Sequence, residues 1–182
     1  MITGSVARRY ARAMLELATE DGLAEKVGAD LTDFQATVHG SPELERTLVN
    51  PGFERQQRRE VVRALLERGG YQEVTRNFLL LLVDKGRIDH LAAIVREYGA
   101  LLDRQLGRTR ATVRCAAPLA EKDLEQLREM LEKVTGKTVL LDHEVDPALI
   151  GGIVTKVGGM VFDGSLKTQL GRLHERLSRE MA

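Results

Sequence analysis

The sequence has little of several things that would point to a secreted or membrane-spanning protein. Its 182 residues include a single cysteine, Cys115, so no intrachain disulfide can form, which fits a reducing compartment. The longest purely apolar run, residues 78–83, is far shorter than the roughly 20 residues that a membrane-spanning helix needs. Net charge is also missing, because 27 basic and 27 acidic residues cancel. The molecule as a whole therefore has no electrostatic attraction to nucleic acid or acidic lipid.

Motifs that carry chemistry are missing as well. The four histidines lie in different predicted elements and none has the spacing of a metal site. Residues 136–138 read Gly-Lys-Thr like the end of a P-loop, but Leu131 stands where the first glycine is required. The glycine pairs at 151–152 and 158–159 lack dinucleotide-binding spacing, and Cys115 lies in an alternating segment typical of a core residue. We therefore expect no catalytic residue, no metal and no cofactor.

The first hundred residues are predicted to form amphipathic helices. Apolar residues recur at helical spacing over residues 4–19, 23–38, 42–49, 54–68, 73–85 and 89–106, with glycine or proline between the segments. Ser41 and Pro42 are the N-cap and the first residue of the third helix, which ends before Pro51. The sequence thus predicts six helices and no strand in this half.

At Gly107 the period changes from 3.6 to 2. Ala111, Val113 and Cys115 alternate with polar residues, as in a half-buried strand, and a helix follows over residues 121–134. Residues 138–141 are predicted as a strand, residues 153–157 and 160–162 as a hairpin around two glycines, and a last helix begins after Ser165 with Leu166, Leu170, Leu173 and Leu177 on one stripe. We expect an α+β protein: a six-helix bundle at residues 1–106, then a small β-α-β-β-β-α domain at residues 107–182.

The fifth helix has an unusual pattern. Residues 78–83 leave almost no polar face through nearly two turns, so the helix must be covered on both sides. The first helix has a stripe with Val6, Tyr10, Ala13 and Leu17, and a second, alanine-rich stripe suited to close helix packing. A closed bundle would explain the fifth helix. The other explanation is a groove between the first and fifth helices that binds an amphipathic helix of another protein.

The fourth helix is basic, with Arg55, Arg58, Arg59 and Arg63. A basic helix face is one signature of nucleic-acid binding, and this function is the main alternative. Glutamates lie among the arginines, however, and no aromatic residues are interleaved for base stacking. A solvated helix surface explains the pattern equally simply, and a binding module of some other kind is a third possibility.

Several motifs along the chain are found together in one known family. They are residues 6–13 (VARRYARA), 77–79 (NFL), 85–87 (KGR), 117–119 (APL), 145–152 (VDPALIGG) and 158–166 (GGMVFDGSL). In their order and spacing they resemble the delta subunit of F-type ATP synthases, called the oligomycin-sensitivity-conferring protein in mitochondria. The resemblance covers essentially the full length.

The resemblance implies a non-catalytic subunit of the peripheral stalk, or stator. The N-terminal domain would bind N-terminal helices of alpha subunits on the catalytic head, and the C-terminal domain would bind the C-terminal ends of the b subunits. Rotor torque would then drive ATP synthesis instead of turning the head. The groove residues that the resemblance implies are Val6, Tyr10, Ala13, Met14, Phe78, Leu81, Leu82 and Lys85.

The resemblance also implies where the protein acts. We expect one copy per complex, no nucleic acid partner, and membrane association only indirectly, through the complex. The sequence starts without a transit peptide, which favours a bacterial protein at the cytoplasmic face of the cell membrane.

Overall fold

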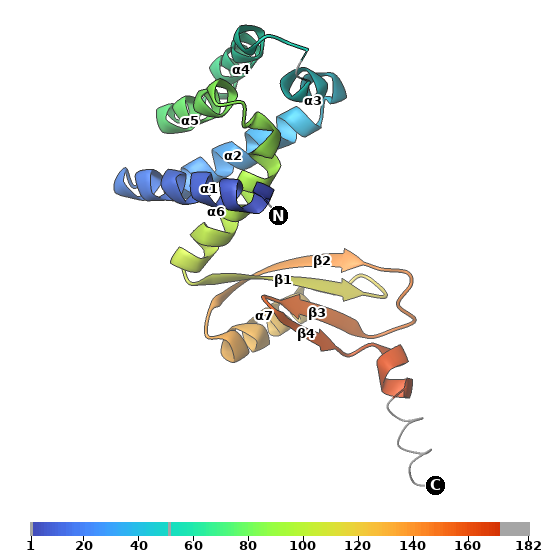
Figure 1. Ribbon diagram of the computed structural model, residues 1–182. Coiled ribbons are helices and arrows are strands. Elements are labelled where there is room, and N and C mark those ends of the chain that lie inside the picture. Colours follow the sequence, from blue (N-terminus) through green and yellow to red (C-terminus); the bar gives the residue numbers. More distant parts are fainter. Residues whose placement is uncertain (1, 51, 172–182) are drawn as a thin grey trace. The chain divides into compact units, whose positions relative to one another are not determined.

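The computed structural model describes residues 2–50 and 52–171, with side chains from Gly4 onward (Figure 1). Its contacts divide the chain into two compact units, Met1–Leu102 and Asp103–Ala182. The boundary falls four residues before the position predicted from the change of period at Gly107. The two units are described separately below.

The N-terminal unit is helical, as predicted. Its elements are α1 (Ile2–Glu20), α2 (Ala24–His39), α3 (Pro42–Val49), α4 (Arg55–Gly69), α5 (Glu73–Asp84), the 3-10 turn η1 (Ile88–His90) and α6 (Leu91–Gln105), whose last residues belong to the second unit. The predicted N-cap is confirmed, because the Ser41 hydroxyl accepts a hydrogen bond from the Leu44 N–H at 3.4 Å. The predicted start of the sixth helix, at about Asp89, was wrong, because α6 begins at Leu91. Residues 88–90 form a tighter 3-10 turn, which apolar spacing does not distinguish from an α-helical turn.

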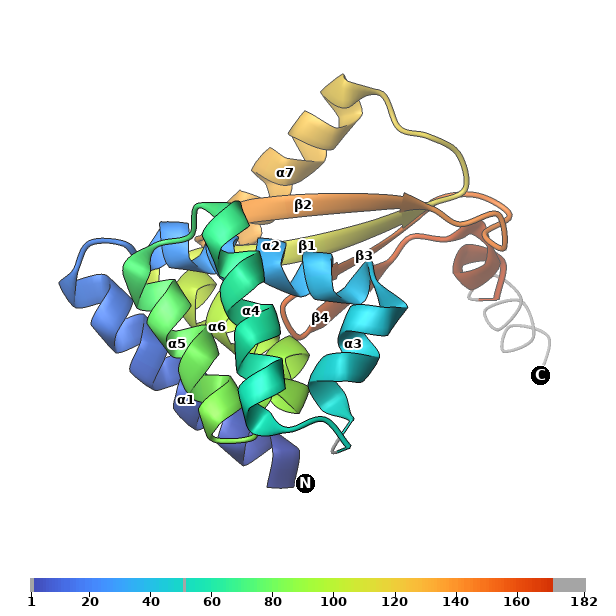
Figure 2. The same ribbon diagram turned by 90° about the horizontal axis from the view of Figure 1, so that it is seen from above.

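Aliphatic and aromatic side chains from all of these helices form one core. The fully buried apolar residues of α5 are Leu79, Leu82 and Val83, and α1 contributes Ala7, Ala11 and Ala18 with no exposed surface. The alanine-rich stripe of the first helix is therefore the core-facing side, where small side chains allow close packing. Figure 2 shows α5 between α1 and α4.

A carboxylate of α2 fixes the start of α5. Asp30 accepts hydrogen bonds from the Gln72 N–H and from the Thr75 hydroxyl, both at 2.9 Å, and Thr75 is fully buried. In a capping box the third helical residue would satisfy the Gln72 N–H, but here the Asp30 carboxylate of the neighbouring helix accepts this hydrogen bond, and the Gln72 side chain makes no cap bond itself. One turn along α2, the Tyr71 hydroxyl donates to Asp33 at 2.7 Å. Burial and then this hydrogen bond raise the pKa of Tyr71 to about 12.

Removing the Asp30 carboxylate tests this anchor. Asp30→Ala leaves the Gln72 N–H and the buried Thr75 hydroxyl without their acceptor, and we expect a loss of about 2–3 kcal/mol of unfolding free energy. Urea unfolding followed by circular dichroism measures this change. Glu67→Ala, at an exposed position of α4, is the control. Equal stabilities of the Asp30→Ala variant and the wild type would show that the anchor is unimportant.

The C-terminal unit contains a mixed four-stranded sheet. Its elements are β1 (Arg108–Cys115), α7 (Glu121–Thr135), β2 (Thr138–Val145), β3 (Ile153–Val157) and β4 (Met160–Asp163), followed by helical residues 166–171. The strand order is β2-β1-β3-β4, with β1 parallel to β2 and antiparallel to β3. The predicted order of elements and the hairpin are found. Leu173 and Leu177, predicted on the last helix, lie outside the described residues.

The second strand is four residues longer than predicted. The sequence indicates a strand only over residues 138–141, because Asp142, His143 and Glu144 end the apolar pattern. These polar residues nevertheless pair in parallel with Thr112, Val113 and Arg114 of β1, so the ladder continues to Val145. β2 is an edge strand, whose polar side chains can remain in water.

Close backbone contact joins the loop before β3 to the start of the last helix. The Leu166 N–H donates to the Gly151 carbonyl at 3.0 Å, and the Gly164 N–H donates to the Ile153 carbonyl at 2.9 Å. Gly152 has a φ of 84°, and a Cβ built on it would lie 2.3 Å from the Gly164 carbonyl oxygen. The predicted N-cap is confirmed here too, since the Ser165 hydroxyl accepts from the Thr168 N–H at 3.3 Å.

Gly152→Ala should destabilise the C-terminal unit by about 2–4 kcal/mol, because a side chain there is both strained and in collision with backbone. Gly159→Ala is the matched control, since a Cβ at Gly159 meets nothing within 4 Å and its φ is not positive. Thermal unfolding of the two variants measures the difference. Similar melting temperatures would contradict the account of this contact.

Candidate functional site

An apolar groove runs between α1 and α5 on the N-terminal unit. It has a volume of about 800 Å³ and is lined by Tyr10, Ala13, Met14, Leu17, Asp21, Leu23, Gln72, Glu73, Val74, Asn77, Phe78 and Leu81. The Tyr10 and Phe78 rings meet edge to face across it, with centroids 6.4 Å apart. Ala13, Leu17 and Leu81 are exposed in this groove, whereas Met14 and Phe78 are buried at its base and also belong to the core.

The fifth helix has two apolar sides in the structure. Leu79, Leu82 and Val83 are fully buried in the core, whereas Leu81 on another side is 43% exposed and lines the groove. The closed-bundle explanation leaves Leu81 unaccounted for, because within the described residues no neighbouring helix covers it. An exposed leucine in an apolar groove is typical of a protein-binding surface.

The structure brings five of the eight predicted groove residues together in this lining. These are Tyr10, Ala13, Met14, Phe78 and Leu81. Val6 is half-buried and lies outside the lining, and Lys85 is exposed just beyond the end of α5. Leu82 has no exposed surface, so it supports the groove from the core and presents no contact surface to an occupant. Helix periodicity could not separate Leu81 from Leu82, because the whole segment is apolar.

Seven groove residues were not among those predicted: Leu17, Asp21, Leu23, Gln72, Glu73, Val74 and Asn77. Leu17 follows Tyr10 and Ala13 along the same stripe of the first helix, so the sequence carried a usable signal for it. Val74 precedes Phe78 by one turn and Leu81 by two turns on α5, so helical spacing was a usable signal for it as well. Leu23 lies just before α2 and reaches the groove only through tertiary packing, which no local sequence pattern marks.

The arginines of α4 make contacts inside the N-terminal unit. Arg55 donates to the Asp84 carbonyl at 3.3 Å, Arg59 pairs with the Asp84 carboxylate at 3.3 Å, and Arg58 donates to the Leu48 carbonyl at 3.4 Å. These contacts satisfy carbonyls at the C-terminal ends of α5 and α3, where positive charge is favourable. Three of the four arginines thus make contacts within the fold, which gives the basic pattern of this helix a structural explanation.

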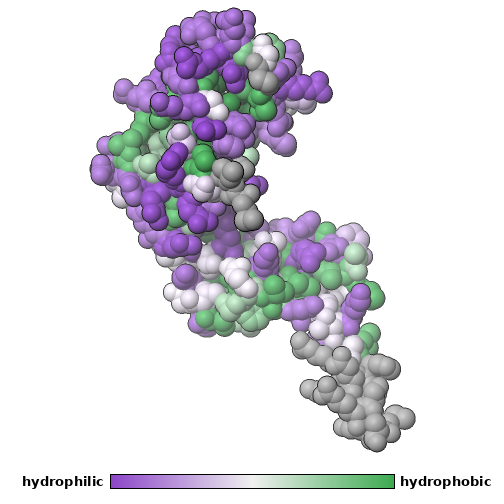
Figure 3. Space-filling view, viewed as in Figure 1, coloured by the Kyte–Doolittle hydropathy of each residue, from purple (hydrophilic) through white to green (hydrophobic). Residues whose placement is uncertain are grey.

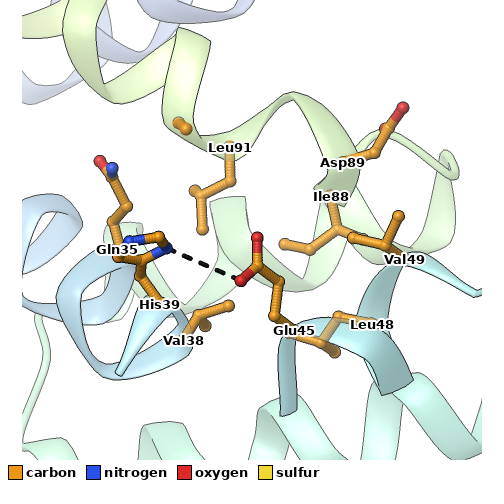
Figure 4. Close-up of a pocket in the computed structure, with 10 residues that line it drawn as sticks. Gln35, Val38, His39, Glu45, Leu48, Val49, Ile88, Asp89 and Leu91 are labelled. Atoms are coloured by element: carbon orange, nitrogen blue, oxygen red, sulfur yellow. Dashed lines mark ion pairs between the residues drawn. The ribbon is translucent and has the colours of Figure 1, made fainter. Parts of the chain in front are cut away.

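A second, much smaller hollow lies between α2, α3 and η1 (Figure 4). Its volume is about 80 Å³, and its buried lining residues Val38, Leu48, Ile88 and Leu91 belong to the core. His39 Nδ1 and Glu45 Oε2 lie 3.7 Å apart at its exposed side. This hollow is one tenth the size of the groove and cannot hold a helix.

The C-terminal unit has an apolar surface of its own. Phe162 pairs with Thr155, which pairs with Val113, so these three side chains lie on the same face of the sheet. On this face α7 packs through Leu131 against Ala111, Val139 and Val157. The four strands span about 14 Å between the outer strands, more than the roughly 10 Å diameter of one helix.

The β4 side of this sheet is consequently uncovered within the described residues. Phe162 is 44% and Met160 48% exposed. Further exposed apolar residues of the unit are Leu106, Met130, Val134, Val145, Ile150, Val161, Leu166 and Leu170, and Figure 3 shows apolar surface among the polar residues of this part. Among the described residues of the unit, the largest fully buried side chains are Val113 and Val157. The part of this face formed by Met160 and Phe162 is the second candidate for protein binding.

Neither surface contains a metal centre. Among the described residues, no three His, Cys, Asp or Glu side chains are grouped to hold a metal ion. Cys115 is buried in the sheet, as expected of a core residue. Within the same residues, no helix has the length and apolar character to span a membrane.

Comparison with known proteins identifies relatives over almost the whole chain. The family model described as ATP synthase delta (OSCP) subunit matches residues 6–177. The ATP synthase subunit delta of Anaeromyxobacter sp. (strain Fw109-5) is 45% identical over 179 residues, covering 98% of this chain and all of the relative. The protein of the same name from Desulfatibacillum aliphaticivorans is 45% identical over 177 residues, covering 97% of both chains.

A solved structure has the same fold. A chain of the Toxoplasma gondii mitochondrial ATP synthase hexamer, determined by cryo-EM, is 24% identical, with a TM-score of 0.75 over 94% of this chain and 96% of that chain. The family match and the bacterial relatives carry the identification. The chain therefore belongs to the ATP synthase delta (OSCP) subunit family and is a structural, non-catalytic subunit of that complex.

Proposed function

We propose that this subunit is the stator link of the ATP synthase, binding alpha subunits of the catalytic head through its N-terminal unit and the b subunits through its C-terminal unit. The observation that carries the proposal is the exposure of Leu81 in the α1–α5 groove. A link of this kind would keep the head from turning with the rotor, so that torque drives ATP synthesis. The protein would act at the cytoplasmic face of a bacterial membrane, in one copy per complex and held there only through its partners.

The groove has the dimensions of a helix-binding site. The lining extends from Tyr10 to Asp21, eleven residues further along the chain. At the helical rise of 1.5 Å per residue this length corresponds to about 16 Å, or three turns. An amphipathic helix of that length presents apolar anchors at positions i, i+3 or i+4, and i+7 to such a groove. An N-terminal helix of an alpha subunit is the occupant that we propose.

The C-terminal unit offers a matching surface for the b subunits. Within the described residues, α7 is the helix that covers this sheet, and the part of the face with Met160 and Phe162 could bind a second helix beside it. We propose that the C-terminal end of a b subunit supplies that helix. Separate surfaces on separate units would allow both partners to bind at once.

Leu81→Asp tests the alpha-subunit groove. The charge would be buried without a partner when a helix binds, so we expect the affinity for an alpha-subunit N-terminal peptide to fall at least about 100-fold. The bundle should stay folded, because Leu81 is 43% exposed in the wild type. Isothermal titration calorimetry measures the affinity, and circular dichroism checks the fold.

The control for this experiment is Val49→Asp, which introduces the same charge at a residue that is 50% exposed and lies outside the groove. Its affinity should equal that of the wild type. An unchanged affinity of the Leu81→Asp variant would contradict the proposal that the groove binds the alpha-subunit helix.

Phe162→Asp tests the b-subunit surface. We expect binding to the soluble part of the b subunits to weaken at least tenfold, because the charge would lie under the docked helix. Val161→Asp is the matched control on the opposite face of the same strand, where the side chain is 61% exposed. Surface plasmon resonance with immobilised b subunits compares the two variants. Loss of binding in the Val161→Asp variant alone would place the contact on the other face.

A further inference from the structure

The two ends of the α1–α5 groove carry opposite charges. Asp21 and Glu73 line one end. Asp21 directly follows α1 and Glu73 is the first residue of α5, so the C-terminal end of one helix lies beside the N-terminal end of the other. The Tyr10–Phe78 ring contact lies away from this end, before Asp21 on α1 and after Glu73 on α5. The helices that form the groove are therefore antiparallel (Figure 2).

Basic residues flank the opposite end. The Arg9 guanidinium carbon lies 5.7 Å from the centre of the Tyr10 ring, which lines the groove. The Lys85 N–H donates to the Leu81 carbonyl at 2.9 Å, so helical geometry continues to Lys85 and places it one turn beyond Leu81 on the same side of α5. Both basic residues are exposed.

The separation of these charges is large enough for the two ends to act independently. Arg9 and Asp21 are twelve residues apart along one helix, and Glu73 and Lys85 are twelve residues apart along the other. Twelve residues of helical rise correspond to about 18 Å, compared with a Debye length of about 8 Å at physiological ionic strength. Between the two ends the lining is mainly apolar, with Ala13, Met14, Leu17, Val74, Phe78 and Leu81.

We propose that the groove is directional and binds an amphipathic helix in one orientation, with the basic end of that helix at Asp21 and Glu73 and its acidic end at Arg9 and Lys85. The inference rests on the proposed function, which supplies the occupant, an alpha-subunit N-terminal helix. Apolar contacts in the groove bind either orientation, because burial of apolar surface has no direction. The reverse orientation brings like charges together at both ends, so the charges select between the two.

Photo-crosslinking reads the orientation directly. The probe is a synthetic peptide of the alpha-subunit N-terminal helix from the same organism, carrying benzoylphenylalanine at its basic end or at its acidic end, mixed with the full chain. Mass spectrometry should place crosslinks from the basic end within residues 17–24 and 72–74. Crosslinks from the acidic end should fall within residues 5–10 and 81–87.

A charge exchange tests the cause of that orientation. Asp21→Lys places a positive charge just after the C-terminal end of α1, where the helix dipole favours it, so the fold should persist. Affinity for the native peptide should fall about three- to tenfold at low ionic strength, and a peptide whose basic-end residues are changed to glutamate should recover it. Glu67→Lys, exposed on α4 outside the groove, changes the net charge equally and should have no effect.

The possible failures differ from one another. Crosslinks in the reverse pattern, or equally at both ends, would overturn the directional groove while leaving the groove as a binding site. An unchanged affinity in the Asp21→Lys variant would also overturn it. A native peptide that does not bind at all would contradict the proposed function and this inference together.

Discussion

The N-terminal unit depends on α5 being buried on one side and exposed on another. Leu79, Leu82 and Val83 hold this helix in the core, and Leu81 remains free to line the groove. Such a helix is costly to leave exposed in isolation, because each leucine removed from water contributes about 1.5–3 kcal/mol. The same apolar run that stabilises the fold therefore also lines the groove that we propose as a binding surface.

The hydrogen bonds of Asp30 at the start of α5 hold this helix, and with it the groove, in position. Asp30 of α2 satisfies the Gln72 N–H and the buried Thr75 hydroxyl, and at the other end of the helix Arg55 and Arg59 of α4 bind the carbonyl and the carboxylate of Asp84. Both ends of α5 are thus held by side chains of neighbouring helices. A rigid groove loses little conformational entropy when it binds a partner, which favours affinity.

The sequence predicted the helices and strands well, but it predicted the residues that line the α1–α5 groove only in part. Helical period, the Ser41 cap and the glycine pair of the hairpin are local signals, and the structure confirms them. The anchor between Asp30 and Thr75 joins residues 45 positions apart, so no local pattern reveals it. The assignment of Leu81 to the groove and Leu82 to the core likewise depends on tertiary packing, because the two residues are chemically identical. The basic helix was ambiguous for a related reason, since its arginines contact carbonyl groups that cannot be located before the fold is known.

The central claim is that one chain binds two partners through separate surfaces. The most direct measurement is the affinity for the soluble part of the b subunits, by titration calorimetry, with the protein either free or saturated with the alpha-subunit peptide. The account predicts the same affinity in both conditions and a stable ternary complex with one copy of this chain. Competition between the peptide and the b subunits for the protein would contradict it.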